Sequence, residues 1–214
     1  MLGGEDPYSG SKGAAELIIN SYYKSILINN RNLSISVSRA GNVIGGGDWS
    51  EDRIVPDCIK SWSKNRIVKI RNPHSTRPWQ HVLEVVRGYL QSAIIVKFNK
   101  KLNGEVFNFG PNNSQNKSVV QLVREIKKYW SQVDWQIVKA KVDKKESKLL
   151  KLNSNKSKSL LNWMPILNFS QAVKLTASWY KQFYKKKNCY HLSISQIFYY
   201  EKKLTEHKSF KSFK

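Results

Sequence analysis

Tyr8 and Lys12 stand four residues apart in the stretch DPYSGSKGAAE. In a helix, this spacing places both side chains on one face. A phenol becomes an effective base when a nearby cation favours its phenolate form, and a lysine one turn away can supply that cation. The pair therefore fits proton transfer at a carbinol, and the lysine could also hold the ribose hydroxyls of a nicotinamide cofactor. An ordinary surface tyrosine and lysine would have the same spacing, so the pair alone leaves both interpretations open.

The residues around the pair favour the helix that this chemistry needs. Asp6 is a good N-cap, and Pro7 suits the first helical position. Apolar residues then recur with helical spacing and predict a helix over 7–29. The stripe consists of Leu17, Ile18, Tyr22, Ile26 and Leu27. Such a stripe can face a domain core or a second protein surface.

The rest of the chain alternates between strand and helix patterns. Leu33, Ile35 and Val37 alternate with serines, which predicts a strand that ends before the glycines at 45–47. Further strands are predicted over 67–71, 104–110, 134–140 and 148–153. Helices are predicted over 53–62, 82–97, 118–130, 155–162, 169–184 and about 193–204. This alternation predicts an α/β fold.

Composition limits the class of protein. The 214 residues are 40% hydrophobic and 12% aromatic, which is enough for a real core. No apolar run approaches the roughly 18 residues that span a bilayer, and the first ten residues lack the basic and apolar regions of a signal peptide. The two cysteines predict neither a disulfide framework nor a zinc site. A cytosolic protein is the simplest interpretation.

The net charge of +22 comes from 37 lysines and arginines against 15 acidic residues. Such an excess can indicate binding to a nucleic acid. The lysines are spread over the predicted helices rather than gathered in one stripe, and no nucleic-acid-binding motif accompanies them. A basic nucleic-acid-binding protein is therefore the less favoured alternative.

Five stretches carry a resemblance to a known family. They are DPYSGSKGAAE, RAGNVIGGGDW, RIVPDCI, RNPHSTRPWQHV and FNFGP, in this order. Together they resemble the extended short-chain dehydrogenase/reductase family of sugar-nucleotide epimerases and dehydratases, and within it the branch that dehydrates CDP-glucose. The resemblance covers nearly the whole chain but corresponds to the C-terminal part of the family's Rossmann-like fold. It implies that residues 1–48 end the Rossmann-like domain and that residues 49–214 form the substrate-binding region.

The resemblance implies an NAD-dependent lyase. In this family C4 of the sugar is oxidised, water leaves across C5–C6, and C6 is reduced to give a CDP-4-keto-6-deoxyglucose. By resemblance, Tyr8 is the general base, and Lys12 tunes it and holds the cofactor ribose. Ala40, Asn42 and Val43 are expected to border the nicotinamide and the sugar phosphates.

The resemblance also implies residues that bind CDP-glucose. Asn42, Arg53 and Arg77 are expected at the substrate, the two arginines facing its pyrophosphate, since guanidinium groups bind phosphate oxygens bidentately. His81 stands where the family has a polar aromatic residue near the substrate cleft, and we expect it to be structural. No metal is expected at this site.

The family's N-terminal half has no counterpart in the sequence. That half carries the glycine-rich loop for the NAD pyrophosphate and the segment that supplies the acid expelling water. We therefore expect that the chain alone neither binds NAD tightly nor dehydrates CDP-glucose. The expected partners are a second copy bound through helix 7–29 and a separate N-terminal half. The alternative is a non-enzymatic remnant that binds a nucleotide sugar or a partner protein.

Overall fold

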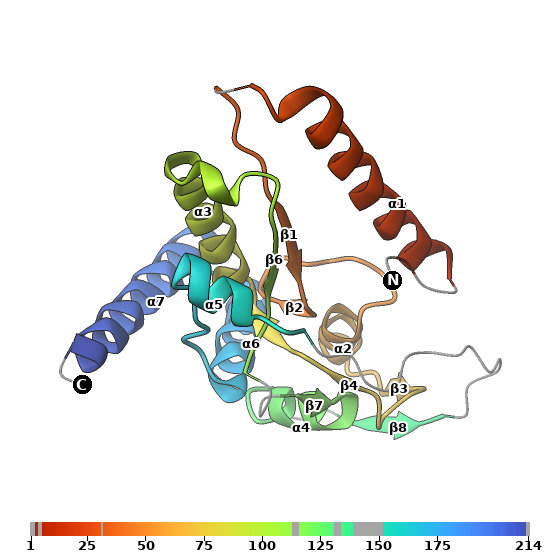
Figure 1. Ribbon diagram of the computed structural model, residues 1–214. Helices are drawn as coiled ribbons and strands as arrows, with labels where there is room; N and C mark the ends of the chain where they lie inside the picture. Colours follow the sequence, from red (N-terminus) through yellow and green to blue (C-terminus); the bar gives the residue numbers. More distant parts are fainter. Residues whose placement is uncertain are drawn as a thin grey trace. The chain divides into compact units, whose positions relative to one another are not determined.

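The computed structural model describes residues 3, 6–30, 32–112, 116–130, 134–138 and 152–212. Its helices are α1 (Pro7–Tyr22), α2 (Ile54–Trp62), α3 (Val82–Phe98), α4 (Val119–Lys127), α5 (Asn155–Leu161), α6 (Phe169–Tyr184) and α7 (Cys189–Ser212), with a π-helical turn η1 (Tyr23–Leu27) and a 3₁₀ turn η2 (Lys100–Leu102). Its strands are β1 (Val37–Ala40), β2 (Val43–Ile44), β3 (Val68–Ile70), β4 (Thr76–Arg77), β5 (Gln80–His81), β6 (Val106–Phe109), β7 (Lys117–Ser118) and β8 (Trp135–Ile137). Strands and helices alternate along most of the chain, which confirms the predicted α/β class (Figure 1).

The chain forms two compact units. Unit 1 contains Met1–Arg39, Arg87–Asn108 and Ser154–Trp163, and unit 2 contains Ala40–Val86, Phe109–Asn153 and Met164–Lys214. The predicted boundary near residue 48 concerns functional domains and stays a prediction. The strand predicted over 148–153, and the end of the one predicted over 134–140, fall mostly outside the described residues.

In unit 1, two helices flank a pair of strands. β1 pairs with β6, and α1 and α3 lie on opposite sides of the pair (Figure 1). On the inner side of α3, Ser92 and Val96 are buried, and Ser92 Oγ lies 2.9 Å from Ser36 Oγ. On the other side, Glu16 of α1 accepts a hydrogen bond of 2.6 Å from Nε of Arg39 on β1. Unit 1 thus has a layered α/β/α arrangement, with a pair of strands between helices.

Helix α1 begins as the sequence predicts. The Asp6 carboxylate accepts a hydrogen bond of 2.9 Å from the Ser9 amide, and Pro7 opens the helix. The helical conformation continues to Leu27 through η1, which lies within the predicted range 7–29. Gly13 is the sole buried residue of α1. The apolar stripe faces solvent rather than a core, since Leu17, Ile18, Tyr22 and Ile26 are all exposed.

Unit 2 holds the main hydrophobic core. Its strands form three pairs among the described residues: β2 with β5 and β3 with β8 run parallel, and β4 with β7 runs antiparallel. Helices α2, α4 and α6 bury their apolar sides against one another and the strands. The fully buried members with the largest side chains include Ile59, Trp62, Leu122, Ile126 and Tyr180.

Side-chain caps explain where the later helices begin. Ser118 and Asn168 each form a capping box, with Gln121 and Gln171 respectively, at the starts of α4 and α6. Asn188 accepts hydrogen bonds from the amides of Tyr190 and His191. This cap explains why α7 begins at Cys189, earlier than the predicted start near residue 193.

Candidate functional site

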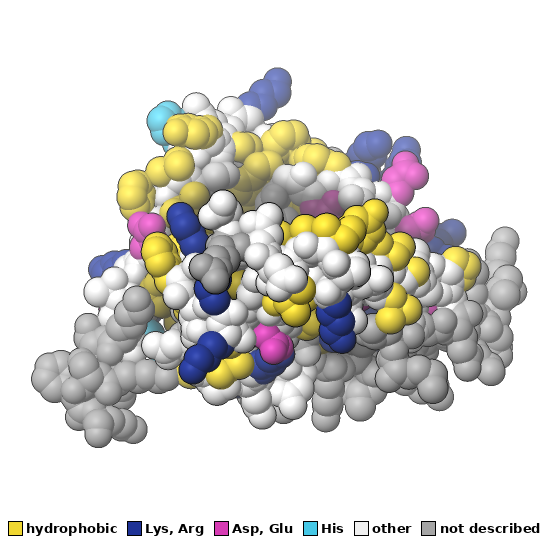
Figure 2. Space-filling view, turned by 45° about the horizontal axis from the view of Figure 1, so that its top comes forward, with side chains coloured by type: hydrophobic (Ala, Val, Ile, Leu, Met, Phe, Trp, Pro, Cys, Tyr) yellow, Lys and Arg dark blue, Asp and Glu magenta, His cyan; other side chains and the backbone are white. Residues whose placement is uncertain are grey.

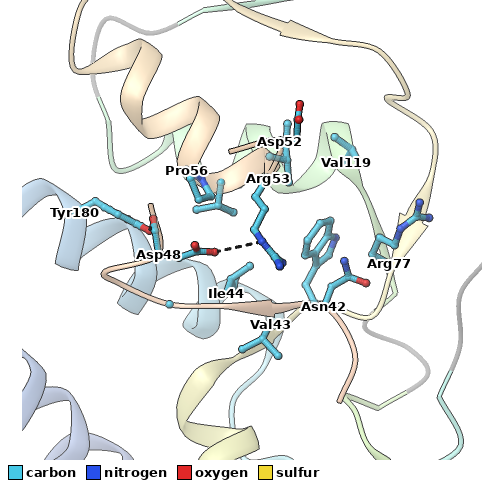
Figure 3. A pocket seen from close by; sticks show the side chains of 14 residues that line it. Asn42, Val43, Ile44, Asp48, Asp52, Arg53, Pro56, Arg77, Val119 and Tyr180 are labelled. Carbon is cyan, nitrogen blue, oxygen red and sulfur yellow. Dashed lines mark hydrogen bonds and ion pairs between the residues drawn. The ribbon is translucent and has the colours of Figure 1, made fainter. Parts of the chain in front are cut away.

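A cavity of about 230 Å³ in unit 2 brings together residues from separate stretches of the sequence. It is lined by the β2 strand and the loop after it, by the first turn of α2, and by residues of β4, α4 and α6 (Figure 3). The lining includes Asn42, Val43, Arg53 and Arg77, four of the residues that the sequence predicts at a site. Ala40, the last residue of β1, does not line this cavity.

Arg53 reaches into the middle of the cavity (Figure 3). It is the N-cap residue of α2, with an extended backbone, so its side chain projects beside the first turn of that helix. Its Nε lies 4.0 Å from a carboxylate oxygen of Asp48, and its side chain is 64% exposed. Because a helix N-terminus also carries partial positive charge, this end of the cavity favours an anion.

Arg77 also lines the cavity, and Figure 3 shows its guanidinium group directed away from Arg53. Arg77 lies on β4, whose pairing with β7 places it opposite Lys117. Its Nη1 donates a hydrogen bond of 2.9 Å to the carbonyl oxygen of Thr76. Nearby, the Trp79 indole donates a hydrogen bond of 2.9 Å to the Lys117 carbonyl oxygen, which fixes the ring in the cavity wall.

The loop after β2 is held by an aromatic cluster. The hydroxyl of the buried Tyr180 donates a hydrogen bond of 2.6 Å to the carbonyl oxygen of Asp48. Burial raises the pKa of Tyr180, which keeps the phenol a donor. Trp49 packs edge-on against Tyr180 with ring centroids 5.2 Å apart. The loop therefore presents the Asp48 side chain to the cavity from a fixed backbone.

Asn42 is positioned through its backbone. Its carbonyl oxygen accepts a hydrogen bond of 3.0 Å from the amide of Gln80, at the point where β2 pairs with β5. The same parallel pairing sets Ile44 opposite His81, which is buried and does not line the cavity. The structural role expected for His81 stays a prediction, but its burial fits that role.

Tyr8 and Lys12 lie in the first two turns of α1, in unit 1. The Lys12 ammonium group is 5.6 Å from the centroid of the Tyr8 ring. Tyr8 is 71% exposed, and Lys12 is also exposed. The two side chains therefore share one accessible helix face, which is the arrangement that proton transfer to a bound ligand requires.

Asp48, Asp52, Trp79 and Tyr180 are lining residues that the sequence reasoning missed. The stretch GGGDW predicted a loop but did not indicate that Asp48 faces a cavity. Tyr180 lies on the apolar stripe of the helix predicted over 169–184, far from the other lining residues in the sequence. A sequence pattern does not distinguish a tyrosine of the core from a tyrosine that lines a site.

Comparison with known proteins gives the family. Residues 2–176 match the family model described as GDP-mannose 4,6 dehydratase. The chain is 36% identical over 184 residues to the CDP-glucose 4,6-dehydratase of Salmonella typhimurium, which covers 84% of this chain and 51% of that enzyme. The chain belongs to the GDP-mannose 4,6-dehydratase family. A more distant member, human dTDP-D-glucose 4,6-dehydratase, is 25% identical over 190 residues.

Solved structures share the fold of this chain. The dTDP-glucose 4,6-dehydratase of Bacillus anthracis, solved with NAD, matches with a TM-score of 0.70 and 24% identity over 85% of this chain and 54% of that one. The UDP-glucuronic acid 4-epimerase of Bacillus cereus, solved with UDP-glucuronic acid and NAD, matches with a TM-score of 0.69 and 20% identity, over 83% and 53%. At these identities the matches establish the Rossmann-like fold. The chain spans about half the length of these relatives.

No described helix is long and apolar enough to cross a membrane.

Proposed function

We propose that the chain binds CDP-glucose in the unit 2 cavity and carries the tyrosine–lysine pair of a CDP-glucose 4,6-dehydratase that works with NAD. The observation that carries the proposal is that Arg53, Arg77 and Asn42 all line one cavity. The 36% identity to the Salmonella typhimurium enzyme favours CDP-glucose over other nucleotide sugars.

The cavity has the chemistry that a nucleotide diphosphate sugar needs. Guanidinium groups from Arg53 and Arg77, with the start of α2, would bind the pyrophosphate oxygens. The carboxylates of Asp48 and Asp52 can accept hydrogen bonds from ligand hydroxyls. Trp79 adds an aromatic wall held by its own hydrogen bond.

The tyrosine–lysine pair has the chemistry to act on the substrate and to bind the cofactor. Bound NAD would supply the oxidation of C4 and the later reduction of C6. Tyr8 would take the proton of the C4 hydroxyl, and the Lys12 ammonium group would favour the phenolate and hold the cofactor ribose. Ala40, Asn42 and Val43 would border the nicotinamide. The exposure of Tyr8 and Lys12 leaves both side chains open to such a ligand.

We also propose a homodimer through α1. Ile18, Tyr22 and Ile26 form an exposed stripe at four-residue spacing, and hydrophobic side chains form a yellow band across the region of α1 in Figure 2. Such a stripe suits antiparallel packing against the same helix of a second copy. Ile18→Asp is expected to abolish dimer formation in sedimentation experiments, whereas the exposed polar change Ser21→Asp should leave it intact.

A second candidate function is binding without turnover. All lining residues of the cavity belong to unit 2, whereas Tyr8 and Lys12 belong to unit 1. Recognition of the nucleotide sugar therefore does not require the residues that would perform chemistry. Such a protein would bind CDP-glucose and release it unchanged.

Calorimetric titration tests the proposed ligand directly. CDP-glucose is expected to bind more tightly than dTDP-glucose and GDP-mannose, and Arg53→Ala should weaken it about tenfold. Arg66→Ala removes an exposed arginine that does not line the cavity, so it serves as the matched control. Equal affinity for all three sugars, or no binding at millimolar concentration, would reject the assignment. Product formation with added NAD then distinguishes turnover from binding alone.

A further inference from the structure

The loop between β2 and α2, residues 45–53, is bound by side chains at two consecutive carbonyl groups. The Tyr180 hydroxyl of α6 donates a hydrogen bond of 2.6 Å to the carbonyl oxygen of Asp48. The Lys60 ammonium group of α2 donates a hydrogen bond of 2.6 Å to the carbonyl oxygen of Trp49. A charged donor makes a stronger hydrogen bond than a neutral one. Side chains from two helices thus fix the loop backbone next to the cavity.

The Asp48 carboxylate connects this fixed backbone to Arg53. Its Oδ1 atom accepts a hydrogen bond of 3.0 Å from the Ser50 amide, which is the pattern of an Asx turn. Its Oδ2 atom lies 4.0 Å from Nε of Arg53, and Figure 3 draws this ion pair as a dashed line. Because the ion pair engages Nε, the two terminal nitrogens of the guanidinium group can bind a ligand.

Arg53 depends on such positioning. Its side chain is 64% exposed, and a long exposed side chain samples many rotamers. An exposed ion pair at this distance is weak by itself, so it directs Arg53 only while the carboxylate stays in place. The side chains that hold the Asp48 backbone therefore affect how often the guanidinium group points into the cavity.

Lys60 and Tyr180 differ from the residues already assigned to the ligand. Lys60 does not line the cavity, and Tyr180 lines it with its hydroxyl bound to Asp48. Tyr180 also lies beyond residue 176, where the match to the family model ends. The Tyr180 ring packs against Trp49 with centroids 5.2 Å apart, so removing the hydroxyl alone would leave this packing in place.

We propose that Lys60 and Tyr180 are positioning residues, which strengthen pyrophosphate binding by fixing Asp48 and, through it, Arg53. The inference rests on the proposed function for its ligand, a nucleotide diphosphate sugar. It goes beyond that function because it assigns part of the affinity to two side chains that need not contact the ligand. An arginine ordered before binding loses less entropy when the ligand arrives, and this raises the affinity.

A double-mutant cycle tests the proposal by calorimetry with CDP-glucose and with inorganic pyrophosphate. Tyr180→Phe and Lys60→Met should each weaken both ligands about fivefold, because each removes a hydrogen bond that fixes the loop. In the Arg53→Ala background, the same changes should alter the affinity less than about twofold, since the side chain that they position is gone.

Two further variants separate positioning from a general loss of structure. Lys60→Arg keeps a charged donor and should retain most of the wild-type affinity. Lys64→Met removes an exposed lysine four residues further along that does not line the cavity, so it is the matched control for Lys60→Met. Equal weakening with and without Arg53 would overturn the proposal, and so would unchanged affinity in both Tyr180→Phe and Lys60→Met.

The two ligands distinguish failure of this proposal from failure of the proposed function. If CDP-glucose binds selectively but the coupling to Arg53 is absent, positioning is rejected and the proposed function stands. If pyrophosphate binds with the coupling but CDP-glucose binds no more tightly than dTDP-glucose and GDP-mannose, the proposed function is rejected and positioning stands. If neither ligand binds at millimolar concentration, both are rejected.

Discussion

The buried side chain of Glu84 accepts a hydrogen bond of 2.6 Å from the hydroxyl of Tyr200, although 116 positions separate the two residues. Glu84 lies in the first turn of α3, and Tyr200 lies near the middle of α7. The other carboxyl oxygen of Glu84 accepts hydrogen bonds of 2.6 Å from the amides of Ile166 and Leu167. One side chain therefore holds both the segment before α6 and the C-terminal helix within unit 2.

Removing the hydroxyl of Tyr200 should destabilise this connection. Tyr200→Phe is expected to lower the free energy of unfolding by roughly 2 kcal/mol, because a buried acceptor loses a partner. Glu84→Ala should cost more, since it also leaves the amides of Ile166 and Leu167 without this acceptor. Urea unfolding followed by circular dichroism measures both changes. Tyr190→Phe, at a tyrosine that is 70% exposed, is the control, and a loss equal to that of Tyr200→Phe would contradict the prediction.

Acid should destabilise the fold through His81. Burial lowers the pKa of His81 to about 4, against 6.5 for the free side chain. The unfolded chain therefore binds a proton between pH 6.5 and 4 that the folded chain excludes, so stability falls as the pH falls through this window. At pH 5 the loss relative to pH 7.5 is about 2 kcal/mol.

Replacement of the imidazole isolates this contribution. His81→Phe should show a smaller loss of unfolding free energy between pH 7.5 and pH 5 than the wild type does. His74 is exposed, so His74→Gln should keep the wild-type dependence. Parallel curves for the wild type and His81→Phe would mean that His81 is protonated in the folded protein as readily as in the unfolded chain.

Arg53 should contribute to the affinity for CDP-glucose through both its charge and its bidentate geometry. Arg53→Lys keeps the charge but loses the bidentate geometry, so we expect binding of CDP-glucose to weaken about three- to tenfold, with Arg53→Ala weaker still. Increasing salt should reduce the difference between wild type and Arg53→Ala, because the side chain is largely exposed. If neither the substitution of Arg53 nor the salt concentration changed the affinity for CDP-glucose, the pyrophosphate would not bind at Arg53.

Tyr8→Phe should separate binding from chemistry. The cavity residues all lie in unit 2, so the affinity of the chain for CDP-glucose should stay within about twofold of the wild type. In an assay with NAD and the separate N-terminal half expected from the sequence, the same change should reduce turnover by two orders of magnitude or more, because the general base is lost. Lys12→Met should also lower turnover, because the ammonium group beside Tyr8 is lost. If the Tyr8→Phe variant turned over CDP-glucose at the wild-type rate, Tyr8 would be excluded as the general base.

Local sequence signals predicted most of the long elements, and the family resemblance pointed to several residues that line the cavity. The Asp6 cap and Pro7 gave the start of α1, and the alternation around Val37 indicated β1, although regular pairing begins later than Leu33. Arg53 and Arg77 were assigned through flanking motifs, and both line one cavity.

Long-range packing accounts for what the sequence did not predict. Strands such as β4 and β5 have two residues each, too few for any periodic pattern. Tyr180 reaches Asp48 across 132 positions, a pairing that depends on the packing of the whole core. By contrast, Asn188 was a local signal for the start of α7 that could have been recognised as a cap.

The glycines at 45–47 restrict how this gene can change. A Cβ atom at Gly46 would lie 2.1 Å from the Trp179 ring, and one at Gly45 would lie 2.7 Å from Val82. These glycines let helices approach the loop closely, which differs from the phosphate-cradling use of a glycine-rich loop. Every amino-acid replacement that a single nucleotide change makes in a glycine codon adds a Cβ atom. Both codons can therefore drift only at their silent third base unless Trp179 or Val82 changes as well.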